Sequence, residues 1–198
     1  MTFIVASFYT INTGYEAEAK QRLIPSLEAF GIPYDIVGIA SKGPWERNIY
    51  EKGQVILDAM QRVGYVVDVV WLDADAEVVS YPKLFNELKC DFAYHARGKQ
   101  QRLSSGTMYF RNNFAGRLLV EDWRNKLRDE VSSTRPRTEQ QVLQKDVLPF
   151  YPQLKIEHLP LSYSTIFDKT QPDEPVVIRH HQASRRLKNE VVKRSSNT

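Results

Sequence analysis

The segment from Val66 to Leu72 restricts the fold more than any other part of the sequence. It is rich in valine, ends in Trp71-Leu72 and is followed directly by acidic residues. A short run of mostly apolar residues is typical of a strand that is covered on both faces, as in the middle of a parallel sheet. We therefore expect this strand near the centre of a sheet, with helices packed on both sides.

Alternating strand and helix patterns lead up to that strand. The expected elements are a strand over Phe3–Phe8, a helix with Leu23, Leu27 and Phe30 on one face that Pro25 bends and Gly31 ends, a strand over Tyr34–Ile39, a polar loop over Ala40–Glu46, and a helix that buries Val55, Ile56, Met60 and Val63 and ends at Gly64. This β-α-β-α-β order favours a parallel sheet with right-handed crossovers.

Beyond Leu72 the alternation is looser. We expect a short helix over Leu84–Leu88, a strand over Asp91–His95, a polar loop over Ala96–Leu103, a strand over Thr107–Phe110, helices over Ala115–Arg128 and Glu139–Val147, and short strands near Ile156 and Val176. The predicted fold class is α/β, with a mixed, mainly parallel sheet flanked by helices. The 198 residues fit one domain, 1–188, followed by a polar, basic tail, 189–198.

Composition and charge narrow the range of protein classes. No apolar run approaches the roughly 18 residues that span a bilayer. The first residues lack the basic stretch of a signal peptide, and the single cysteine, Cys90, suits a reducing compartment, so we expect a cytoplasmic protein. Arg179 to Thr198 holds six basic residues and one acid, a charge of +5 (6 − 1) against +3 for the whole chain. Such a segment either binds phosphate, in a nucleotide, a nucleic acid or a lipid head group, or is a solvated tail.

Two carboxylates stand where the central strand ends. Asp73 and Asp75 are two positions apart and directly follow Leu72. In open α/β sheets the ligand site lies at the carboxyl ends of the strands. At this spacing two carboxylates can share a hard cation such as Mg²⁺ or Mn²⁺, which can in turn bridge the phosphates of a nucleotide. The other interpretation is a pair of solvated acids in a turn.

The Asp73-Ala74-Asp75 segment resembles the Asp-x-Asp motif of nucleotide-sugar transferases of the GT-A type. Further segments are similar to members of that superfamily and occur in the expected order: Gly43-Pro44-Trp45-Glu46-Arg47-Asn48 with Lys52, Ser105-Gly106-Thr107-Met108-Tyr109-Phe110, Glu139-Gln140-Gln141-Val142-Leu143 and His180-His181-Gln182-Ala183-Ser184-Arg185-Arg186. The resemblance runs from about residue 3 to residue 188. It implies a Rossmann-like GT-A fold, a nucleoside-diphosphate sugar as donor, and Mn²⁺ or Mg²⁺ as cofactor.

The resemblance also implies a metal site. Asp75 is the expected main metal carboxylate, and Asp73 is expected to bridge the metal and the ribose or sugar of the donor. His180 resembles the histidine near the chain end that completes the metal site in several such families. Its neighbour His181 is the alternative ligand, and a surface histidine on a basic segment is the third interpretation.

Contacts to the donor follow from the same resemblance. We expect Tyr9 and Thr10 at the nucleotide base, Arg47 and Lys52 at a phosphate or the base, Gly106 close to the sugar, and Arg185 and Lys188 at the leaving diphosphate. Glu139 and Gln140 occupy the place of an Asp-Gln pair that contacts the sugar in relatives, with Glu in place of Asp. Glu139 is also the candidate base for an inverting transfer. The other interpretation of Arg47 and Lys52 is a pair of solvated helix charges.

The implied reaction moves a sugar, expected to come from a UDP-sugar, to an acceptor hydroxyl. We expect the acceptor to be a glycan, a small molecule or a hydroxymethylated base in DNA. The DNA interpretation rests on basic residues that flank the predicted site, namely Arg97, Lys99, Arg102, Arg185, Arg186, Lys188, Lys193 and Arg194. Three alternatives stay open: a haloacid-dehalogenase-like phosphatase, a sugar nucleotidyltransferase, and a non-catalytic nucleic-acid-binding module that uses the basic tail.

Overall fold

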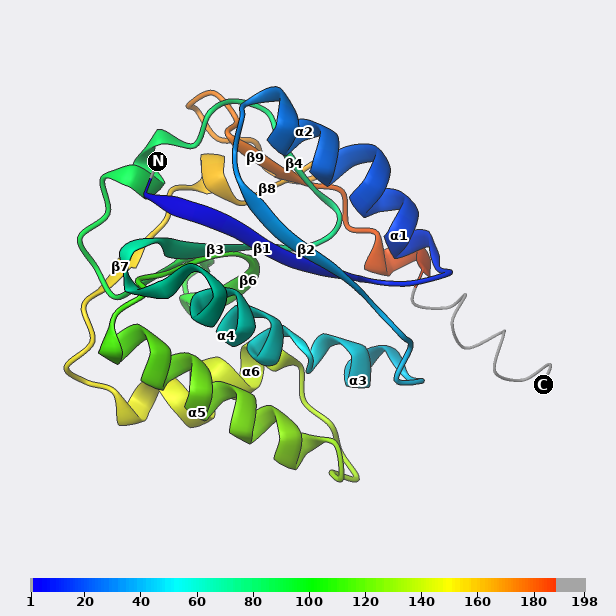
Figure 1. The fold of residues 1–198 in the computed structure, drawn as a ribbon, viewed down its shortest axis with the longest axis vertical. Coiled ribbons are helices and arrows are strands. Elements are labelled where there is room, and N and C mark those ends of the chain that lie inside the picture. Colours follow the sequence, from blue (N-terminus) through cyan, green and yellow to red (C-terminus); the bar gives the residue numbers. More distant parts are fainter. Residues whose placement is uncertain (1, 188–198) are drawn as a thin grey trace.

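The fold is built on a six-stranded sheet with helices against both faces and a second, three-stranded sheet beside it (Figure 1). A computed structural model describes residues 2–187 of the chain. The strands are β1 (Phe3–Thr10), β2 (Tyr34–Ile39), β3 (Asp68–Leu72), β4 (Ala76–Val78), β5 (Phe92–Arg97), β6 (Arg102–Phe110), β7 (Ile156–His158), β8 (Thr165–Ile166) and β9 (Ile178–His180). The α-helices are α1 (Gly14–Glu18), α2 (Ile24–Ala29), α3 (Trp45–Ile49), α4 (Lys52–Val63), α5 (Phe114–Glu130) and α6 (Glu139–Val142).

The large sheet has the strand order β2-β1-β3-β6-β5-β7. β1 lies between β2 and β3 and runs parallel to both. β6 runs antiparallel to β3 and to β5, whereas β7 runs parallel to β5. Within this sheet, as the described residues form it, β6 is thus the strand that runs opposite to the rest. The prediction of a mixed, mainly parallel sheet is confirmed.

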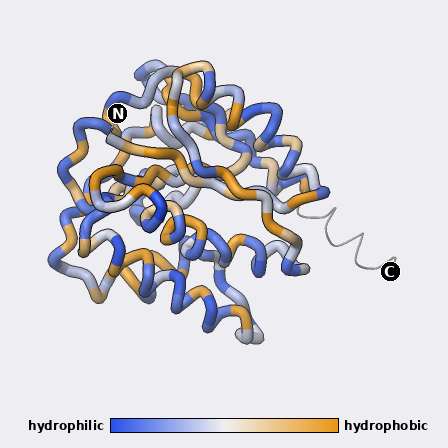
Figure 2. The backbone as a smooth tube through the Cα atoms, in the orientation of Figure 1, coloured by the Kyte–Doolittle hydropathy of each residue, from blue (hydrophilic) through white to orange (hydrophobic). Residues whose placement is uncertain are grey.

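Strand β3 contributes to the cores on both faces of the sheet. Val69 and Trp71 pack into the core under α4 and α5, whereas Val70 and Leu72 pack into the core under α2 and β4. All four side chains are at most 1% exposed. Figure 2 shows the hydrophobic stretches gathered along the middle of the molecule. Strand β3 is apolar almost throughout because both of its faces are buried, as its sequence predicts.

Two helical regions contain π-helical turns. Ala19–Leu23 is π-helical and leads into α2, where Pro25 has no N–H to donate. The N–H of Ile24 reaches back to the carbonyl of Ala19, and this wider turn accommodates the proline where the sequence predicts a bend. The last predicted helix, Glu139–Val147, is α6 followed by a second π-helical turn, Leu143–Val147.

The predicted loop over Ala96–Leu103 is wrong, because most of it is a hairpin. β5 continues to Arg97 and β6 begins at Arg102, which leaves only residues 98–101 in the turn. Gly98 and Gln101 make that turn with positive φ angles of 65° and 49°. Polar and basic side chains hid the strand pattern, although Leu103 between them is fully buried. The polarity of this segment reflects an exposed hairpin end rather than irregular backbone.

In the small sheet, the end of the described chain returns to the strand that follows Asp75. β9 lies between β4 and β8, antiparallel to β4, with His180 opposite Ala76. The predicted strand near Val176 is β9, and it belongs to this second sheet. Lys188 and the predicted tail 189–198, with Lys193 and Arg194, lie outside the described residues.

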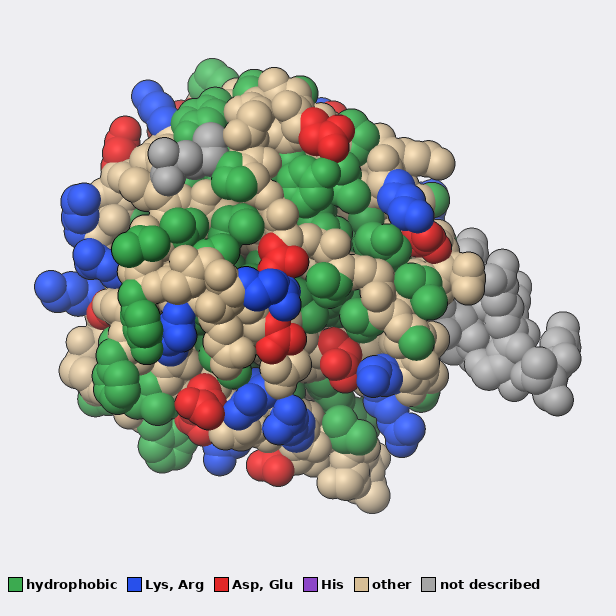
Figure 3. All heavy atoms as spheres, in the orientation of Figure 1, with side chains coloured by type: hydrophobic (Ala, Val, Ile, Leu, Met, Phe, Trp, Pro, Cys, Tyr) green, Lys and Arg blue, Asp and Glu red, His purple; other side chains and the backbone are tan. Residues whose placement is uncertain are grey.

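The visible surface in Figure 3 carries acidic and basic side chains interspersed, without a single-sign patch. Among the residues that the structure describes, no helix is long and apolar enough to cross a membrane.

Candidate active site

A short turn after β3 presents the two predicted carboxylates. The N–H of Asp73 donates to the carbonyl of Gly106 on β6 (2.9 Å), and the N–H of Ala76 donates back to the carbonyl of Asp73 (2.9 Å). These bonds anchor the turn to the neighbouring strand and start β4 directly after Asp75. The Asp73 side chain is 39% exposed, whereas Asp75 is buried.

Strand β9 delivers His180 to the same place. Its Nδ1 lies 3.7 Å from Oδ1 of Asp75, and its Nε2 shares a 2.8 Å hydrogen bond with Oγ1 of Thr107. Ligand atoms of Asp73, Asp75 and His180 all lie within 4.8 Å of one another. His181 is turned aside, with Nε2 2.9 Å from Oε2 of Glu77. The structure thus brings His180, and not His181, to the two aspartates.

The chemistry of these three side chains fits a divalent cation. Two carboxylates and an imidazole suit Mn²⁺ and related divalent ions. If Nδ1 of His180 held a cation, Nε2 would carry the hydrogen and donate a hydrogen bond to Oγ1 of Thr107, the kind of supporting contact that metal-binding histidines usually make. Burial opposes ionisation of Asp75, but His180, the Ala183 N–H and His181 hold its pKa below the ordinary value. Asp75 is therefore ionised at neutral pH, as a metal ligand must be.

Lys52 links this site to Glu139. Its Nζ lies 2.9 Å from Oδ1 of Asp73, 3.0 Å from Oε1 of Glu139 and 3.2 Å from the carbonyl oxygen of Ser105. Burial alone lowers the pKa of Lys52, but the two carboxylates outweigh it and raise that pKa. Burial likewise opposes the charge on Glu139, yet Lys52 and the Ser105 hydroxyl (2.7 Å) hold the pKa of Glu139 below its usual range. We call Asp73, Lys52 and Glu139 the ionic triad.

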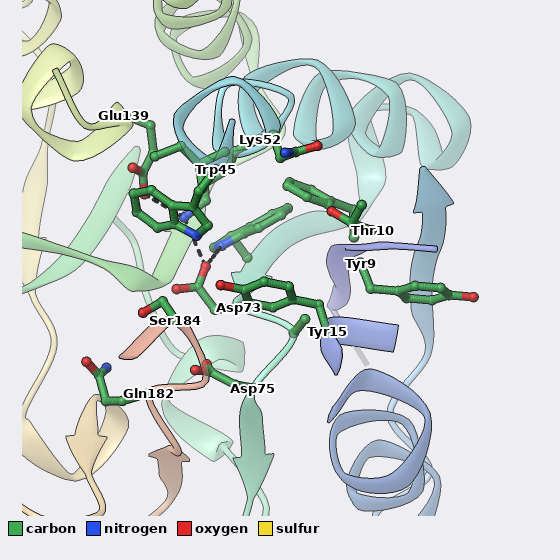
Figure 4. Close-up of a pocket in the computed structure, with 15 residues that line it drawn as sticks. Tyr9, Thr10, Tyr15, Trp45, Lys52, Asp73, Asp75, Glu139, Gln182 and Ser184 are labelled. Atoms are coloured by element: carbon green, nitrogen blue, oxygen red, sulfur yellow. Dashed lines mark hydrogen bonds and ion pairs between the residues drawn. The ribbon is translucent and has the colours of Figure 1, made fainter. Parts of the chain in front are cut away.

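Two adjoining cavities open beside the ionic triad. The first has a volume of about 110 Å³ and includes Tyr9, Thr10, Lys52, Asp73, Asp75 and Glu139 among its lining residues. The second, of about 180 Å³, includes Arg97, Gly106, Gln140 and His180. Trp45, Asp73, Glu139, Gln182 and Ser184 line both. Figure 4 shows these shared residues around Asp73, with Tyr9 extending away from the carboxylates.

Gly106 marks a tight approach on the floor of the second cavity. A Cβ at this position would lie 2.9 Å from Cε1 and 3.2 Å from Nδ1 of His180. Only glycine leaves room here for the imidazole that completes the metal-ligand group.

The segment after β9 crosses the site and ties it to the first helix. The N–H of Ala183 donates to Oδ2 of Asp75 (2.6 Å), and the N–H of His181 donates to the carbonyl of Asp75 (3.1 Å). Farther on, Arg186 pairs with Glu18 at 2.5 Å, and Leu187 packs against Gly14. We call residues 181–187 the closing segment, because its backbone binds Asp75 and its far end returns to the first helix.

Two predicted donor contacts lie apart from the first two cavities, and a third is outside the described residues. Arg47 is exposed and lines neither of them. Arg185 forms an ion pair with Asp168 at 2.5 Å and lines a third cavity. Lys188 is outside the described residues. The roles assigned to these three side chains stay predictions.

The sequence prediction assigned no role to several residues that line the first cavity, among them Tyr15, Trp45, Gln182 and Ser184. Burial, with the nearby charges of Asp75 and Asp73, raises the pKa of Tyr15, so its hydroxyl stays protonated. Trp45 directly follows Gly43-Pro44, and an aromatic residue after such a turn could have been predicted to line the cavity. Nothing in the local pattern shows that Tyr15 at the start of α1 faces the carboxylates.

The fold is similar to that of solved glycosyltransferases of the GT-A type. A glycosyltransferase involved in the glycosylation of the major capsid of PBCV-1 superposes with a TM-score of 0.68, covering 98% of this chain and 100% of its own at 13% identity. GlyE of Streptococcus pneumoniae TIGR4 gives 0.60 at 13% identity, with 98% of this chain and 60% of its own covered. The galactosyltransferase LgtC, in complex with donor and acceptor sugar analogs, gives 0.55 at 10% identity over 98% and 95%.

The family itself follows from the sequence comparison. Residues 65–184 match the family described as nucleotide-diphospho-sugar transferase, and this match covers more than half of the chain. The protein therefore belongs to the nucleotide-diphospho-sugar transferase family and is a sugar-transferring enzyme. No curated protein matches the chain.

Proposed function

We propose that this protein is a divalent-metal-dependent glycosyltransferase that uses a UDP-sugar and Mn²⁺ or Mg²⁺. The observation that carries the proposal is the grouping of Asp73, Asp75 and His180 within 4.8 Å beside two adjoining cavities. The family match supports a nucleotide-sugar donor and favours this function over the phosphatase, nucleotidyltransferase and nucleic-acid-binding alternatives.

The leaving group explains why this chemistry needs the site. The acceptor oxygen bonds to the anomeric carbon, the bond from that carbon to the diphosphate breaks, and the hydroxyl proton is released. Negative charge accumulates on the departing nucleoside diphosphate, and a divalent cation, when bound, stabilises that charge as a Lewis acid. Tyr9 and Thr10 line the cavity that we assign to the nucleotide, and the protonated hydroxyl of Tyr15 faces the carboxylates as a hydrogen-bond donor.

We assign Glu139 and Gln140 to holding the donor sugar. Both line the second cavity, and Glu139 also lines the first. The lowered pKa of Glu139 and its pairing with Lys52 make this carboxylate a poor proton acceptor. It is suited instead to accept hydrogen bonds from sugar hydroxyls while it stays ionised. Gly106 keeps the floor of the same cavity free of a side chain.

The acceptor belongs to one of the classes that the sequence predicts, a glycan, a small molecule or a hydroxymethylated DNA base. We favour a glycan or a small sugar, because the second cavity adjoins a third cavity of a size that suits a small molecule. A cytoplasmic location is part of the same proposal and rests on Cys90 and on the composition.

Donor turnover tests the proposal directly. The full-length protein is incubated with a panel of nucleoside-diphosphate sugars, with and without Mn²⁺ or Mg²⁺, and released nucleotide is measured. Because a Lewis-acid cation contributes several kcal/mol to such a step, Asp75→Asn is expected to lower turnover about a hundredfold or more, with a melting temperature near that of the parent.

Asp173→Asn is the matched control, because Asp173 is exposed and lines none of the three cavities. It is expected to retain parental turnover. Turnover of Asp75→Asn within about tenfold of the parent, or no metal-dependent turnover of any donor, contradicts the proposal.

A further inference from the structure

A third cavity extends the site on the side away from the nucleotide. Its volume is about 420 Å³, within the range of roughly 300–1,000 Å³ for small-molecule sites. It shares Arg97, Ser164, Ile166 and Gln182 with the second cavity. The three cavities therefore form a row, in which the second holds His180 and Gly106 and the third adjoins it. A molecule whose hydroxyl lies in the second cavity reaches the third with its remaining atoms.

The lining of the third cavity is basic. Arg97, Lys169, Arg185 and His95 line it, and no carboxylate does. Arg185 is neutralised by Asp168. Within residues 2–187, neither Arg97 nor Lys169 forms an ion pair. Their two positive charges are available to a ligand.

Arg97 belongs to a like-charge pair that destabilises the fold when no anion is bound. It is directly opposite Arg102 across the β5–β6 hairpin. Like charges directly opposite each other on neighbouring strands are destabilising. Nε of Arg102 donates to the neutral Oε1 of Gln100 (2.8 Å), so no acid compensates. Partial burial and then Arg102 lower the pKa of Arg97, in line with an uncompensated cation.

We propose that the acceptor is a sugar that carries a phosphate or carboxylate group, and that Arg97 and Lys169 bind this group in the third cavity. The proposal rests on the function proposed above and names its acceptor class. A guanidinium matches carboxylate and phosphate oxygens with two parallel hydrogen bonds, which gives orientation as well as affinity. Fixing the acid group in the third cavity leaves a hydroxyl of the same sugar beside His180 and Gly106.

Lys99 is the residue that distinguishes binding inside the third cavity from binding of a polyanion on the surface. It lies in the exposed turn of the same hairpin, close in sequence to Arg97, and lines none of the three cavities. A duplex DNA lying across the hairpin meets Lys99 and Arg97 alike. A sugar acid inside the cavity meets Arg97 alone.

Calorimetric titration of the full-length protein tests the assignment with three probes of one sugar: methyl glucoside, glucuronate and glucose 6-phosphate. Each is titrated into protein saturated with UDP and Mn²⁺. Because hydrogen bonds to charged groups contribute more than neutral ones, at least one acidic probe is expected to bind about tenfold or more tightly than the neutral glycoside. The ranking of glucuronate and glucose 6-phosphate distinguishes a carboxylate from a phosphate acceptor.

Arg97→Gln and Lys169→Gln are each expected to remove most of this preference, and Lys99→Gln is expected to keep it. Arg97→Gln also removes the like-charge pair with Arg102, so its melting temperature should not fall. The proposal is overturned when no acidic probe binds, when the neutral glycoside binds equally well, or when Arg97→Gln keeps the preference. It is also overturned when Lys99→Gln loses affinity to the same extent and the protein binds duplex DNA in a salt-sensitive way.

UDP binding in the same samples keeps the two proposals apart. Retained UDP binding without any preference for acidic probes refutes only the acceptor class. Absence of UDP binding, with and without Mn²⁺, contradicts the proposed function itself.

Discussion

Replacing Lys52 by methionine removes the cation that joins two carboxylates of the site. Lys52 and Glu139 are almost fully buried, with side chains 3% and 7% exposed, whereas Asp73 is 39% exposed and partly screened by solvent. Removing one partner of a buried ion pair typically costs about 3–5 kcal/mol, because the other charge is left without compensation. We expect Lys52→Met to lower the free energy of unfolding by about this amount at neutral pH.

The pH dependence of the stability lost in Lys52→Met shows whether Glu139 is the charge left without a partner. In the parent the pKa of Glu139 lies below its ordinary value of 4.5, so this carboxylate stabilises the fold above that pH and loses its contribution as the pH falls through the lowered pKa. Without Lys52, burial raises that pKa above the ordinary value, and the variant gains stability relative to the parent as Glu139 takes up a proton. The deficit should therefore be largest near neutral pH and should narrow towards the ordinary pKa.

Urea unfolding followed by tryptophan fluorescence measures this deficit at several pH values. Adding Glu139→Gln to Lys52→Met should recover part of the loss, because it removes the uncompensated charge. Lys20→Met is the control, since Lys20 forms an exposed i,i+4 pair with Glu16 and its loss should barely change the unfolding midpoint. A deficit below about 1 kcal/mol, the size of an exposed pair, or one that is independent of pH, refutes a buried ionic triad.

Other changes separate metal binding from stability. His180→Ala should raise the Mn²⁺ concentration needed for half-maximal turnover while His181→Ala does not, and the reverse ranking in a metal titration moves the ligand to His181. Gly106→Ala should weaken metal activation without unfolding the protein, because its Cβ comes within 2.9 Å of the His180 ring; parental metal dependence contradicts this contact. Asn112 is 1% exposed and donates to the carbonyls of Met60 and Val67 at 3.0 Å. Asn112→Ala should therefore lower the free energy of unfolding by about 1–3 kcal/mol in thermal unfolding. The folded variant should keep the parental kcat. Unchanged stability of this variant shows that these bonds contribute nothing.

The sequence was informative wherever burial on both faces dictated residue type. The valine-rich run could only be a covered strand, and its carboxyl end predicted the place of Asp73 and Asp75. His180 was predicted through a family resemblance, and its approach to Asp75 depends on the pairing of β9 with β4, which no local pattern specifies. The end of the β5–β6 hairpin was not predicted, because its exposed part carries polar residues on both strands.

Lys52 shows why the site could not be completed from sequence. On α4 it stands next to an apolar face and equally suits a solvated helix charge or a ligand contact. Its pairing with Glu139 spans 87 residues of sequence, and the contact exists only because α4 and the start of α6 meet beside the end of β3. Tyr15 and Gln182 enter the first cavity through equally long-range packing.

The closing segment joins the two ends of the described chain and is translated after the strands of the large sheet. All strands of the large sheet precede His180 and Ala183 in the chain, so they are translated first. Arg186 meets Glu18 across 168 residues of chain, and contacts of such long range form slowly and late in folding. A nascent chain can thus complete its central strands before His180 and Ala183 reach Asp75.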